Sequence, residues 1–479
     1  MVGSHDSVLD EPPTEAEIGG DKPQFGAPSK FRASAHQNPA PPPYDAERAE
    51  DPRCMSSSCA RSASLVETTG ERRTDFRSWL LMRPLFNLAG TCRRCGCRRT
   101  WVCAARVDPW WFRGLAGDNA AVATLPALSA AEIRAAEAVL ARVWGPAPVR
   151  AAEPIWDRSH VVRLHLATGR CVVLKKRADE DTFGAELAAL EYLNGMPEPV
   201  APRLLGADAG AGIVLMEDLG PGPSLADSLL TGDRSRVRAD LVSYAEALGS
   251  VHAWSMRRPR DPRLGTPPWP GAVARSKDAF LGAAVSLGLA TAGARTEIDR
   301  LSLMLTQTGH HGLVHGDACP DNVRFSGGRC RIFDFEHSGW GPVVLDASYL
   351  LAPFPSCWCF GRLPASVAAP AMSAYRGRLQ AAGIGLGPSW DAAMTAALGA
   401  WIVAWGDRIV RAVEEDGHWG TTTMRPRLLS WLRSFTSAAG RSGVLPGLRV
   451  LAGELHERLA ARWPEAVIAE YPALARPGS

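Results

Sequence analysis

The chain has 479 residues and a mass of 51.3 kDa, which is enough for two or three domains with substantial hydrophobic cores. Lys and Arg total 53 against 50 Asp and Glu, a formal charge of +3, and this near balance argues against a dedicated nucleic-acid surface. No secretory signal opens the sequence, so we expect a cytoplasmic protein. The apolar run over residues 392–405 is too short to cross a bilayer, so it predicts a buried helix and no membrane partner.

The eleven cysteines are unevenly distributed. Six of them fall in the stretch from Cys54 to Cys103, and the rest are scattered along the chain. This pattern is unlike the disulfide framework of a small secreted domain. We therefore expect the scattered cysteines to be reduced thiols.

Residues 1–125 are predicted to form a disordered or low-complexity extension with a Cys-rich segment. The first sixty or so residues are rich in Pro, Ser, Gly and charged side chains and hold few large apolar ones. In "CRRCGCRRTWVC", Cys92 and Cys95 have the spacing of a zinc knuckle, but no second well-spaced pair follows. Three interpretations stay open: a metal-binding segment, a functional interaction segment, or translated sequence upstream of the true start.

Regular structure is predicted from residue 126 onward. In "LSAAEIRAAEAVLARVWG", Ser129 and Glu132 have capping-box spacing and Gly145 can end the helix. The next predicted elements are a strand at Val161–Leu166, a strand at 171–174, a helix over 182–195 that Gly195 ends, and a strand at 213–216. Helices dominate afterwards, with apolar periodicity over 238–254 and over 390–415, where Gly417 can end the helix. Strands followed by helices indicate a sheet lobe leading into a helical lobe.

The run "HGDACPDNVRFSGGRCRIFDFE", residues 315–336, gathers several polar side chains. Asp317 and Asn322 share one loop that Pro320 constrains, and "NVRF-SGG-RCRIF" predicts a hairpin that returns the chain to Asp334. Asn and Asp oxygens suit Mg²⁺, which takes few protein ligands and leaves room for substrate phosphates. We expect Asn322 and Asp334 to hold Mg²⁺, and Asp317 to accept the proton of an attacking hydroxyl.

With Gly after His and Glu after Asp-Phe, this run resembles the aminoglycoside phosphotransferase family of kinase-like enzymes, which includes choline kinase and fructosamine kinase relatives. In that family the pattern His-Gly-Asp, four residues, Asn, then Asp after a hairpin marks small-molecule kinases. The resemblance covers roughly residues 150–440 and rests on several elements in the right order. It implies a two-lobed, protein-kinase-like α+β fold, with a small antiparallel-sheet lobe over 126–219 and a mainly helical lobe over 220–470.

The resemblance also implies a nucleotide site. Lys175 on the strand "VVLKK" would pair with nucleotide phosphates, and Glu186 on the next helix would hold that lysine. Lys176 takes this role if the register slips by one residue, although strand alternation points it to the other face. The backbone groups that would read the edge of adenine or guanine lie in "LMEDLG", at Glu217, Asp218 and Leu219.

The resemblance also implies roles for the phosphate loop and for three further residues near the polar run. The phosphate loop falls at "IWDRSHVV", which has no Gly-rich pattern, so backbone amides near Arg158 and Ser159 would contact the phosphates. His315, included among the catalytic residues, is expected to pack under its loop and hydrogen-bond the loop backbone. Asp346 in "GPVVLDASYL" would brace that loop. Glu336 would either assist metal or substrate or pair with a nearby base.

These features predict transfer of the γ-phosphoryl group of ATP, or of GTP, to a hydroxyl of a small molecule. No Ala-Pro-Glu follows Asp-Phe, which disfavours a protein substrate, and the loop letters "ACPD" differ from the commoner "LHPG" type. An aminoglycoside or similar amino sugar is the family's emblematic acceptor. Glu414 and Glu415 would contact such a cation or form a solvated helix end. The alternative function is a catalytically silent kinase-like module that binds nucleotide.

Overall fold

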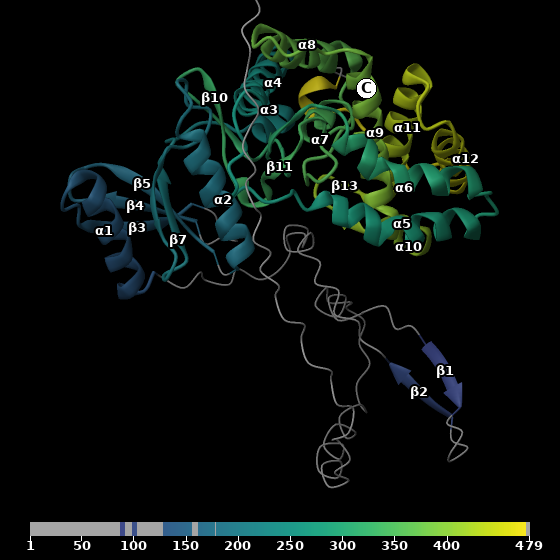
Figure 1. Cartoon of the computed structure of the whole chain (residues 1–479), viewed down its shortest axis with the longest axis horizontal. Coiled ribbons are helices and arrows are strands. Elements are labelled where there is room, and N and C mark those ends of the chain that lie inside the picture. The colour runs from purple at the N-terminus through teal and green to yellow at the C-terminus, as the bar shows by residue number, and fades with distance from the viewer. Residues whose placement is uncertain (1–86, 92–97, 103–127, 156–160, 178, 476–479) are drawn as a thin grey trace, which may run out of the picture. The chain divides into compact units, whose positions relative to one another are not determined.

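The structure is a computed structural model that describes residues 87–91, 98–102, 128–155, 161–177 and 179–475 (Figure 1). A short antiparallel hairpin pairs β1 (Asn87–Thr91) with β2 (Arg98–Val102). Four residues singled out in the sequence, Cys92, Cys95, Arg158 and Ser159, lie outside the described residues. The predictions for most of residues 1–125 also fall outside them.

A five-stranded antiparallel sheet begins the continuous part of the fold. Its strand order is β3-β4-β5-β7-β6, and every neighbouring pair is antiparallel. The strands are β3 (Val149–Pro154), β4 (Val161–Leu166), β5 (Cys171–Lys176), β6 (Leu204–Asp208) and β7 (Ile213–Glu217). The predicted strand positions are confirmed for β4, β5 and β7, whereas β3 and β6 were missed because their residues show little alternation of apolar and polar types.

Two helices cover opposite faces of this sheet. Helix α1 (Ala130–Trp144) starts with the predicted capping box of Ser129 and Glu132, and its Val139 shares a hydrophobic core with alternate residues of β5 and β7. Helix α2 (Glu180–Leu193) follows β5 and packs its buried residues with Val214 and Met216 of β7. Because successive strand side chains point to opposite faces, one strand serves both cores. Figure 1 shows the sheet between these two helices.

The rest of the described chain is mainly helical. Its main helices are α3 (Leu225–Thr231), α4 (Arg234–Met256), α5 (Trp269–Ser286), α6 (Ala292–Thr306), α8 (Ala365–Ala381), α9 (Pro388–Ala404), α10 (Gly406–Glu414), α11 (Met424–Ser442) and α12 (Pro446–Arg462). The short segments are β8 (His311–Val314), β9 (Val323–Ser326), β10 (Arg329–Ile332), η3 (Phe335–His337), β11 (Gly339–Pro342), α7 (Val344–Ala347), η4 (Ser348–Leu350), β12 (His418–Trp419), β13 (Thr422–Thr423) and η5 (Pro472–Leu474).

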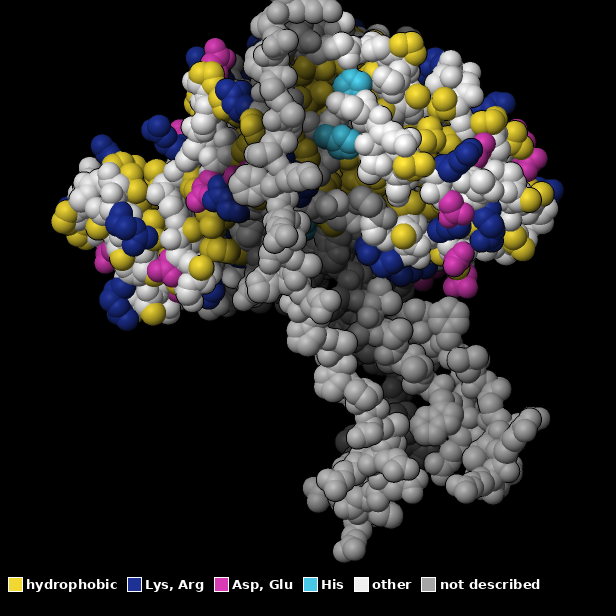
Figure 2. All heavy atoms as spheres, in the orientation of Figure 1, with side chains coloured by type: hydrophobic (Ala, Val, Ile, Leu, Met, Phe, Trp, Pro, Cys, Tyr) yellow, Lys and Arg dark blue, Asp and Glu magenta, His cyan; other side chains and the backbone are white. Residues whose placement is uncertain are grey.

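This architecture confirms the predicted fold class, because an antiparallel sheet precedes a mainly helical region. The lobe boundaries at residues 125, 219 and 470 stay a prediction. Within the described ranges, none of the helices combines the length and the apolar character needed to cross a membrane. Figure 2 shows Lys and Arg side chains interspersed with Asp and Glu on the face in view, rather than gathered in one basic patch.

The prediction of one helix over residues 390–415 is wrong, because the structure divides this stretch into α9 and α10. Trp405 leaves the helical conformation with φ −95° and ψ 14°. The following Gly406 lies so close to helix α5 that an added Cβ would be 2.7 Å from the backbone nitrogen of Phe280. The helix is interrupted where the two backbones approach each other, although the apolar periodicity of the sequence continues past this point. The predicted burial of residues 392–405 is correct for α9.

The prediction that the scattered cysteines are all reduced is also wrong. Cys319 and Cys357 form a disulfide, with their Cα atoms 5.7 Å apart. Cys171, Cys330 and Cys359 are free. The two bonded residues are 38 positions apart, so only the folded chain brings them together.

A buried arginine ties helix α11 to two loops of the helical lobe. Arg427 is 0% exposed, and its guanidinium donates hydrogen bonds to the carbonyl oxygens of Cys357 (2.7 Å), Trp358 (3.0 Å) and Trp419 (2.7 Å). The charge lies over the rings of Phe360 and Trp419. Burial lowers the pKa of Arg427 to about 9, so it remains charged at neutral pH. In the described part of the chain no carboxylate forms a salt bridge with it.

Replacing this arginine should destabilise the protein. Arg427→Met removes the guanidinium that bonds three buried carbonyl groups, although the Trp358 oxygen keeps the backbone nitrogen of Thr421 as a donor, and we expect the free energy of unfolding to fall by about 3–5 kcal/mol. Arg433→Met is the matched control, because Arg433 lies on the same helix but is exposed, and its effect should stay within about 0.5 kcal/mol. Urea unfolding of the two variants measures the difference. Equal stability of both variants would contradict the anchoring role of Arg427.

Candidate active site

The predicted polar run forms a loop between two short strands. We call residues 315–322 the HGD loop, and it joins β8 to β9. Strands β9 and β10 form the predicted hairpin, whose turn contains Gly327 (φ 57°) and Gly328 (φ 76°). Positive φ at two successive turn residues suits glycine and matches the twist of the paired strands. The hairpin returns the chain to Asp334, as the spacing predicts.

A buried carboxylate holds the start of the HGD loop. Asp346, 1% exposed, accepts hydrogen bonds from the backbone nitrogens of His315 (2.6 Å) and Gly316 (3.1 Å). Its Oδ2 also lies 3.2 Å from Nε2 of His252, which belongs to helix α4. Gly316 has φ 83°, and an added Cβ would lie 2.1 Å from the carbonyl oxygen of His337. These contacts have the bracing geometry that the resemblance implies for Asp346.

His315 lies beneath the loop and is almost completely buried. Its Nε2 is 2.9 Å from the carbonyl oxygen of Phe333, and its Nδ1 accepts a 3.3 Å hydrogen bond from the backbone nitrogen of Asp317. Burial lowers the pKa of His315, which favours the neutral ring that this pair of contacts requires. Backbone groups engage both ring nitrogens, so His315 makes the loop-supporting contacts expected of it, and its catalytic role stays a prediction.

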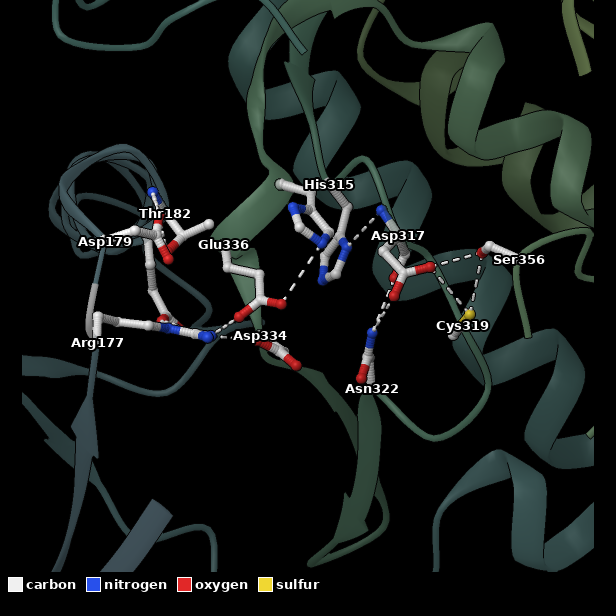
Figure 3. Close-up of polar contacts among 12 residues, drawn as sticks. Arg177, Asp179, Thr182, His315, Asp317, Cys319, Asn322, Asp334, Glu336 and Ser356 are labelled. Carbon is white, nitrogen blue, oxygen red and sulfur yellow. Dashed lines mark hydrogen bonds and ion pairs between the residues drawn. The ribbon is translucent and has the colours of Figure 1, made fainter. Parts of the chain in front are cut away.

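Asp317 is the acidic side chain at the centre of the loop (Figure 3). The Nδ2 group of Asn322 donates to the backbone oxygen of Asp317 (2.9 Å) and to its Oδ2 (3.3 Å). The hydroxyl of Ser356 donates to Oδ1 at 2.6 Å. Burial raises the pKa of Asp317 to about 7, and the nearby carboxylates of Asp321 and Asp334 act in the same direction. A pKa near neutrality gives this carboxylate the basicity that a general base needs.

The sheet and helix α2 contribute a buried ion pair. Lys175 on β5 donates from Nζ to Oε1 of Glu186 at 2.8 Å, and Glu186 is 0% exposed. Lys176 points to the other face of the sheet, where it pairs with Glu132 of helix α1. The register slip that would exchange the two lysines is therefore excluded. An ion pair this deeply buried needs further polar partners to offset the cost of removing both charges from water.

Asp334 supplies such a partner from the helical lobe. It has a left-handed backbone (φ 71°, ψ 54°), and its Oδ1 accepts hydrogen bonds from Lys175 and from Arg177, the latter at 3.0 Å. Burial acts to raise the pKa of Asp334, but the two cations outweigh it and hold this pKa below its ordinary value. Asp334 is therefore ionised. Its positive φ is uncommon for a residue other than glycine, and such residues cluster at functional sites.

Arg177 is a site residue that the sequence reasoning missed. Its guanidinium contacts Oε2 of Glu186 at 3.4 Å, Oδ1 of Asp334 and the carboxylate of Glu336 (Figure 3). Lys175 Nζ also lies 3.7 Å from Glu336, so Glu336 pairs with bases, as one of its two interpretations stated. A signal for Arg177 was present, because a residue two positions after Lys175 shares its face of the strand.

The side chains of Asn322 and Asp334 each have an oxygen atom that suits a hard cation such as Mg²⁺. The amide nitrogen of Asn322 is engaged by Asp317, so the side-chain oxygen is its remaining polar atom. One oxygen of Asp334 is taken by the two cations, and Figure 3 shows the carboxylate and the Asn322 amide on two sides of one gap. Two oxygen donors suit Mg²⁺, which keeps several waters or phosphate oxygens. Among the described residues no group of three or more His, Cys, Asp or Glu is placed to hold a metal ion.

The segment predicted to read the base follows strand β7. The side chain of Glu217 accepts hydrogen bonds from Arg331 (2.7 Å) and from the backbone of Arg203 (3.0 Å). Asp218 accepts from Arg163 (2.6 Å) and from the backbone of Gly220 (2.9 Å). Because neighbouring groups engage both side chains, a base would meet the backbone here. The roles of Glu217, Asp218 and Leu219 stay predictions.

Several supporting residues carried no clear signal in the sequence. His252 lies on the buried side of helix α4, and its Nδ1 is 2.7 Å from the hydroxyl of Tyr375. A histidine on an apolar helix face could have marked it, but such residues are more often satisfied core histidines. Ser356, in the segment after η4, hydrogen-bonds Asp317, and Tyr349 of η4 hydrogen-bonds Ser356. No local spacing relates them to the HGD loop.

Solved structures of phosphotransferases resemble the chain at low sequence identity. An aminoglycoside phosphotransferase from Alicyclobacillus acidocaldarius is 14% identical, with 64% of this chain and 93% of that chain covered and a TM-score of 0.38. A choline kinase from Streptococcus pneumoniae is 13% identical, with 65% and 98% covered and a TM-score of 0.36. A macrolide 2'-phosphotransferase from Brachybacterium faecium is 19% identical, with 59% and 94% covered and a TM-score of 0.37.

None of the curated proteins matches the chain. The assignment therefore depends on a family model described as the phosphotransferase enzyme family (APH), which matches residues 151–384. That range contains the acidic and basic groups of the candidate site from Arg163 to Asp346. The predicted enzyme class, a phosphotransferase, is confirmed. Residues 151–384 thus match the model of the phosphotransferase enzyme family, as the His-Gly-Asp run indicates.

Proposed function

We propose that the protein transfers the γ-phosphoryl group of ATP, or of GTP, to a hydroxyl group of a small molecule. The observation that carries this proposal is the convergence of Lys175, Glu186 and Asp334 from both lobes, beside Asp317 and Asn322 on the HGD loop. Phosphoryl transfer requires positioned cations and a base more than covalent chemistry, and this set supplies both.

Asp317 is the group that receives the acceptor's proton. Its carboxylate is fixed between Asn322 and Ser356, which restricts it to one orientation. A hydroxyl that hydrogen-bonds this carboxylate is aligned for attack on the γ-phosphorus and loses its proton as the new bond forms. The acceptor thus leaves as a phosphate ester, and the nucleoside diphosphate is the second product.

Lys175 clamps the α and β phosphates of the nucleotide, and Glu186 holds the lysine in place from helix α2. Asn322 and Asp334 would hold Mg²⁺, which would neutralise charge on the phosphate oxygens. The backbone from Glu217 to Leu219 would read the base, and the sequence-based prediction that amides near Ser159 bind the phosphates concerns residues outside the described ranges. Because Asp334 now bonds Lys175 and Arg177, nucleotide and metal must share or displace these contacts.

The acceptor is proposed as a hydroxyl-bearing small molecule, and an amino sugar is one candidate. Glu414 and Glu415 were considered as contacts for a cationic acceptor. Both are exposed at the end of helix α10, which matches the solvated helix end. The acceptor class is therefore open among amino sugars, amino alcohols and sugars.

The experiment that tests the function is a nucleotide-consumption assay with Mg²⁺. ATP and GTP are each supplied with a panel of aminoglycosides, amino alcohols and sugars. Consumption that depends on one class of acceptor supports the proposal and names the substrate class. Nucleotide binding without consumption for any acceptor would favour a silent nucleotide-binding module.

Asp317→Asn removes the base but keeps the size of the side chain. We expect kcat to fall by roughly 10²- to 10⁴-fold because the acceptor's proton has no carboxylate to receive it. The dissociation constant for Mg-ATP, measured by calorimetry, should stay within about twofold because the amide still fills the loop. Asp299→Asn, an exposed change on helix α6, is the control. Turnover of the Asp317 variant at the wild-type rate would show that another group is the base.

Two adjacent lysines give a second test. Lys175→Met should lower kcat/KM for the nucleotide by about 100-fold or more, because it removes a phosphate-binding charge and leaves the buried Glu186 with the longer, 3.4 Å contact from Arg177. Lys176→Met is the matched control, since this lysine points to the opposite face and pairs with Glu132. Its kcat/KM should stay within about twofold. Steady-state kinetics of both variants decide the matter, and a larger loss in the Lys176 variant would refute the assignment.

A further inference from the structure

A segment from outside the HGD loop lies directly against it. Residues 354–358, with the sequence Phe-Pro-Ser-Cys-Trp, follow η4, and we call them the brace segment. Phe354 has a positive φ of 43° although it is not glycine, and its side chain is fully buried between Tyr244 and Tyr349. Such a backbone persists only where the surroundings determine it strongly.

The brace segment is attached to the HGD loop at three neighbouring points. The hydroxyl of Ser356 donates to Oδ1 of Asp317 at 2.6 Å. Cys357 is bonded to Cys319 through the disulfide. The indole nitrogen of Trp358 donates to Oδ2 of Asp321 at 2.7 Å. Figure 3 shows Ser356 and Cys319 on the side of Asp317 that faces away from Asp334.

The brace segment is itself held from behind. Arg427 of helix α11 donates to the carbonyl oxygens of Cys357 and Trp358, which follow Ser356 directly. Ser356 therefore cannot move independently of the core of the helical lobe. A serine on a segment fixed on both sides can set the position of the carboxylate to which it donates.

The hydrogen bonds that reach Asp317 along this route run in one direction. When Asp317 is ionised, as a base must be, its carboxylate only accepts, so the Ser356 hydroxyl donates to it. Its oxygen is then free to accept from the hydroxyl of Tyr349, 2.7 Å away. Burial and the Asp317 charge raise the pKa of Tyr349 well above its ordinary value, so the tyrosine keeps its proton and is the donor. The chain runs from Tyr349 through Ser356 to Asp317.

We propose that Ser356 is a positioning residue for the phosphotransfer reaction, which fixes the Asp317 carboxylate so that Oδ2 receives the acceptor's proton. This inference rests on the proposed function. Oδ1 accepts the short bond from Ser356 and lies 3.1 Å from Sγ of Cys319. Among the described residues, Oδ2 accepts the longer 3.3 Å bond from Asn322 and no other, which leaves one of its lone pairs for the acceptor's hydroxyl. A hydrogen bond to an ionised group is among the stronger protein contacts, so losing it frees the carboxylate to rotate.

The test is a double-mutant cycle on the donor chain. Ser356→Ala should lower kcat by about 10- to 100-fold, as misplacing a reacting group does, while KM for the nucleotide stays within about twofold. Ser356→Thr keeps the hydroxyl and should restore most of kcat. Tyr349→Phe should cause a smaller loss by itself and no further loss beside Ser356→Ala, because the chain is already broken. Ser250→Ala, which removes a hydroxyl that donates to the Glu246 carbonyl oxygen within helix α4, is the control for serine replacement.

Each outcome decides between the two proposals. Loss in Ser356→Ala, rescue by Ser356→Thr and coupling to Tyr349→Phe, at unchanged thermal stability, support the positioning role. An active wild type with an equally active Ser356→Ala variant overturns the positioning role and leaves the proposed function intact. Additive losses in the cycle, with lowered melting temperatures, also overturn it by showing a purely structural effect. If the wild-type protein shows no nucleotide consumption with any of the acceptors, both proposals are overturned.

Discussion

The buried ion pair between Lys175 and Glu186, shared with Asp334, is the interaction on which the rest of the site depends. Each partner comes from a different element: strand β5, helix α2 and the turn after β10. Removing three charges from water costs free energy unless each charge is paired in good geometry. The ion pairs therefore favour one relative placement of strand β5, helix α2 and the turn after β10. Arg177 extends the cluster and balances the additional carboxylate of Glu336.

A second set of buried polar contacts fixes the other half of the site. Asp346 holds the first residues of the HGD loop through backbone nitrogens, and helix α4 contributes His252 behind it. The brace segment holds the same loop from its far side, and Arg427 holds the brace segment. Asp317 therefore belongs to a rigid network rather than to a flexible loop, which is the condition that efficient positioning of a reacting group requires.

The sequence was most informative where chemistry and spacing agree. Asp317, Asn322 and Asp334 could be placed because a hairpin of fixed length joins them, and strand alternation separated Lys175 from Lys176. Contacts between distant segments left no such trace. The disulfide and Ser356 meet the HGD loop only after the helical lobe packs, and the break at Trp405 reflects a backbone approach that periodicity does not encode.

The measurement that tests the central claim most directly follows the phosphoryl group itself. ATP carrying ¹⁸O in its γ-phosphoryl group is incubated with the protein, Mg²⁺ and candidate acceptors, and the products are weighed by mass spectrometry. The account predicts that the labelled phosphoryl group appears as an ester on a hydroxyl of one acceptor class. Label found only in inorganic phosphate, whatever the acceptor, would contradict it.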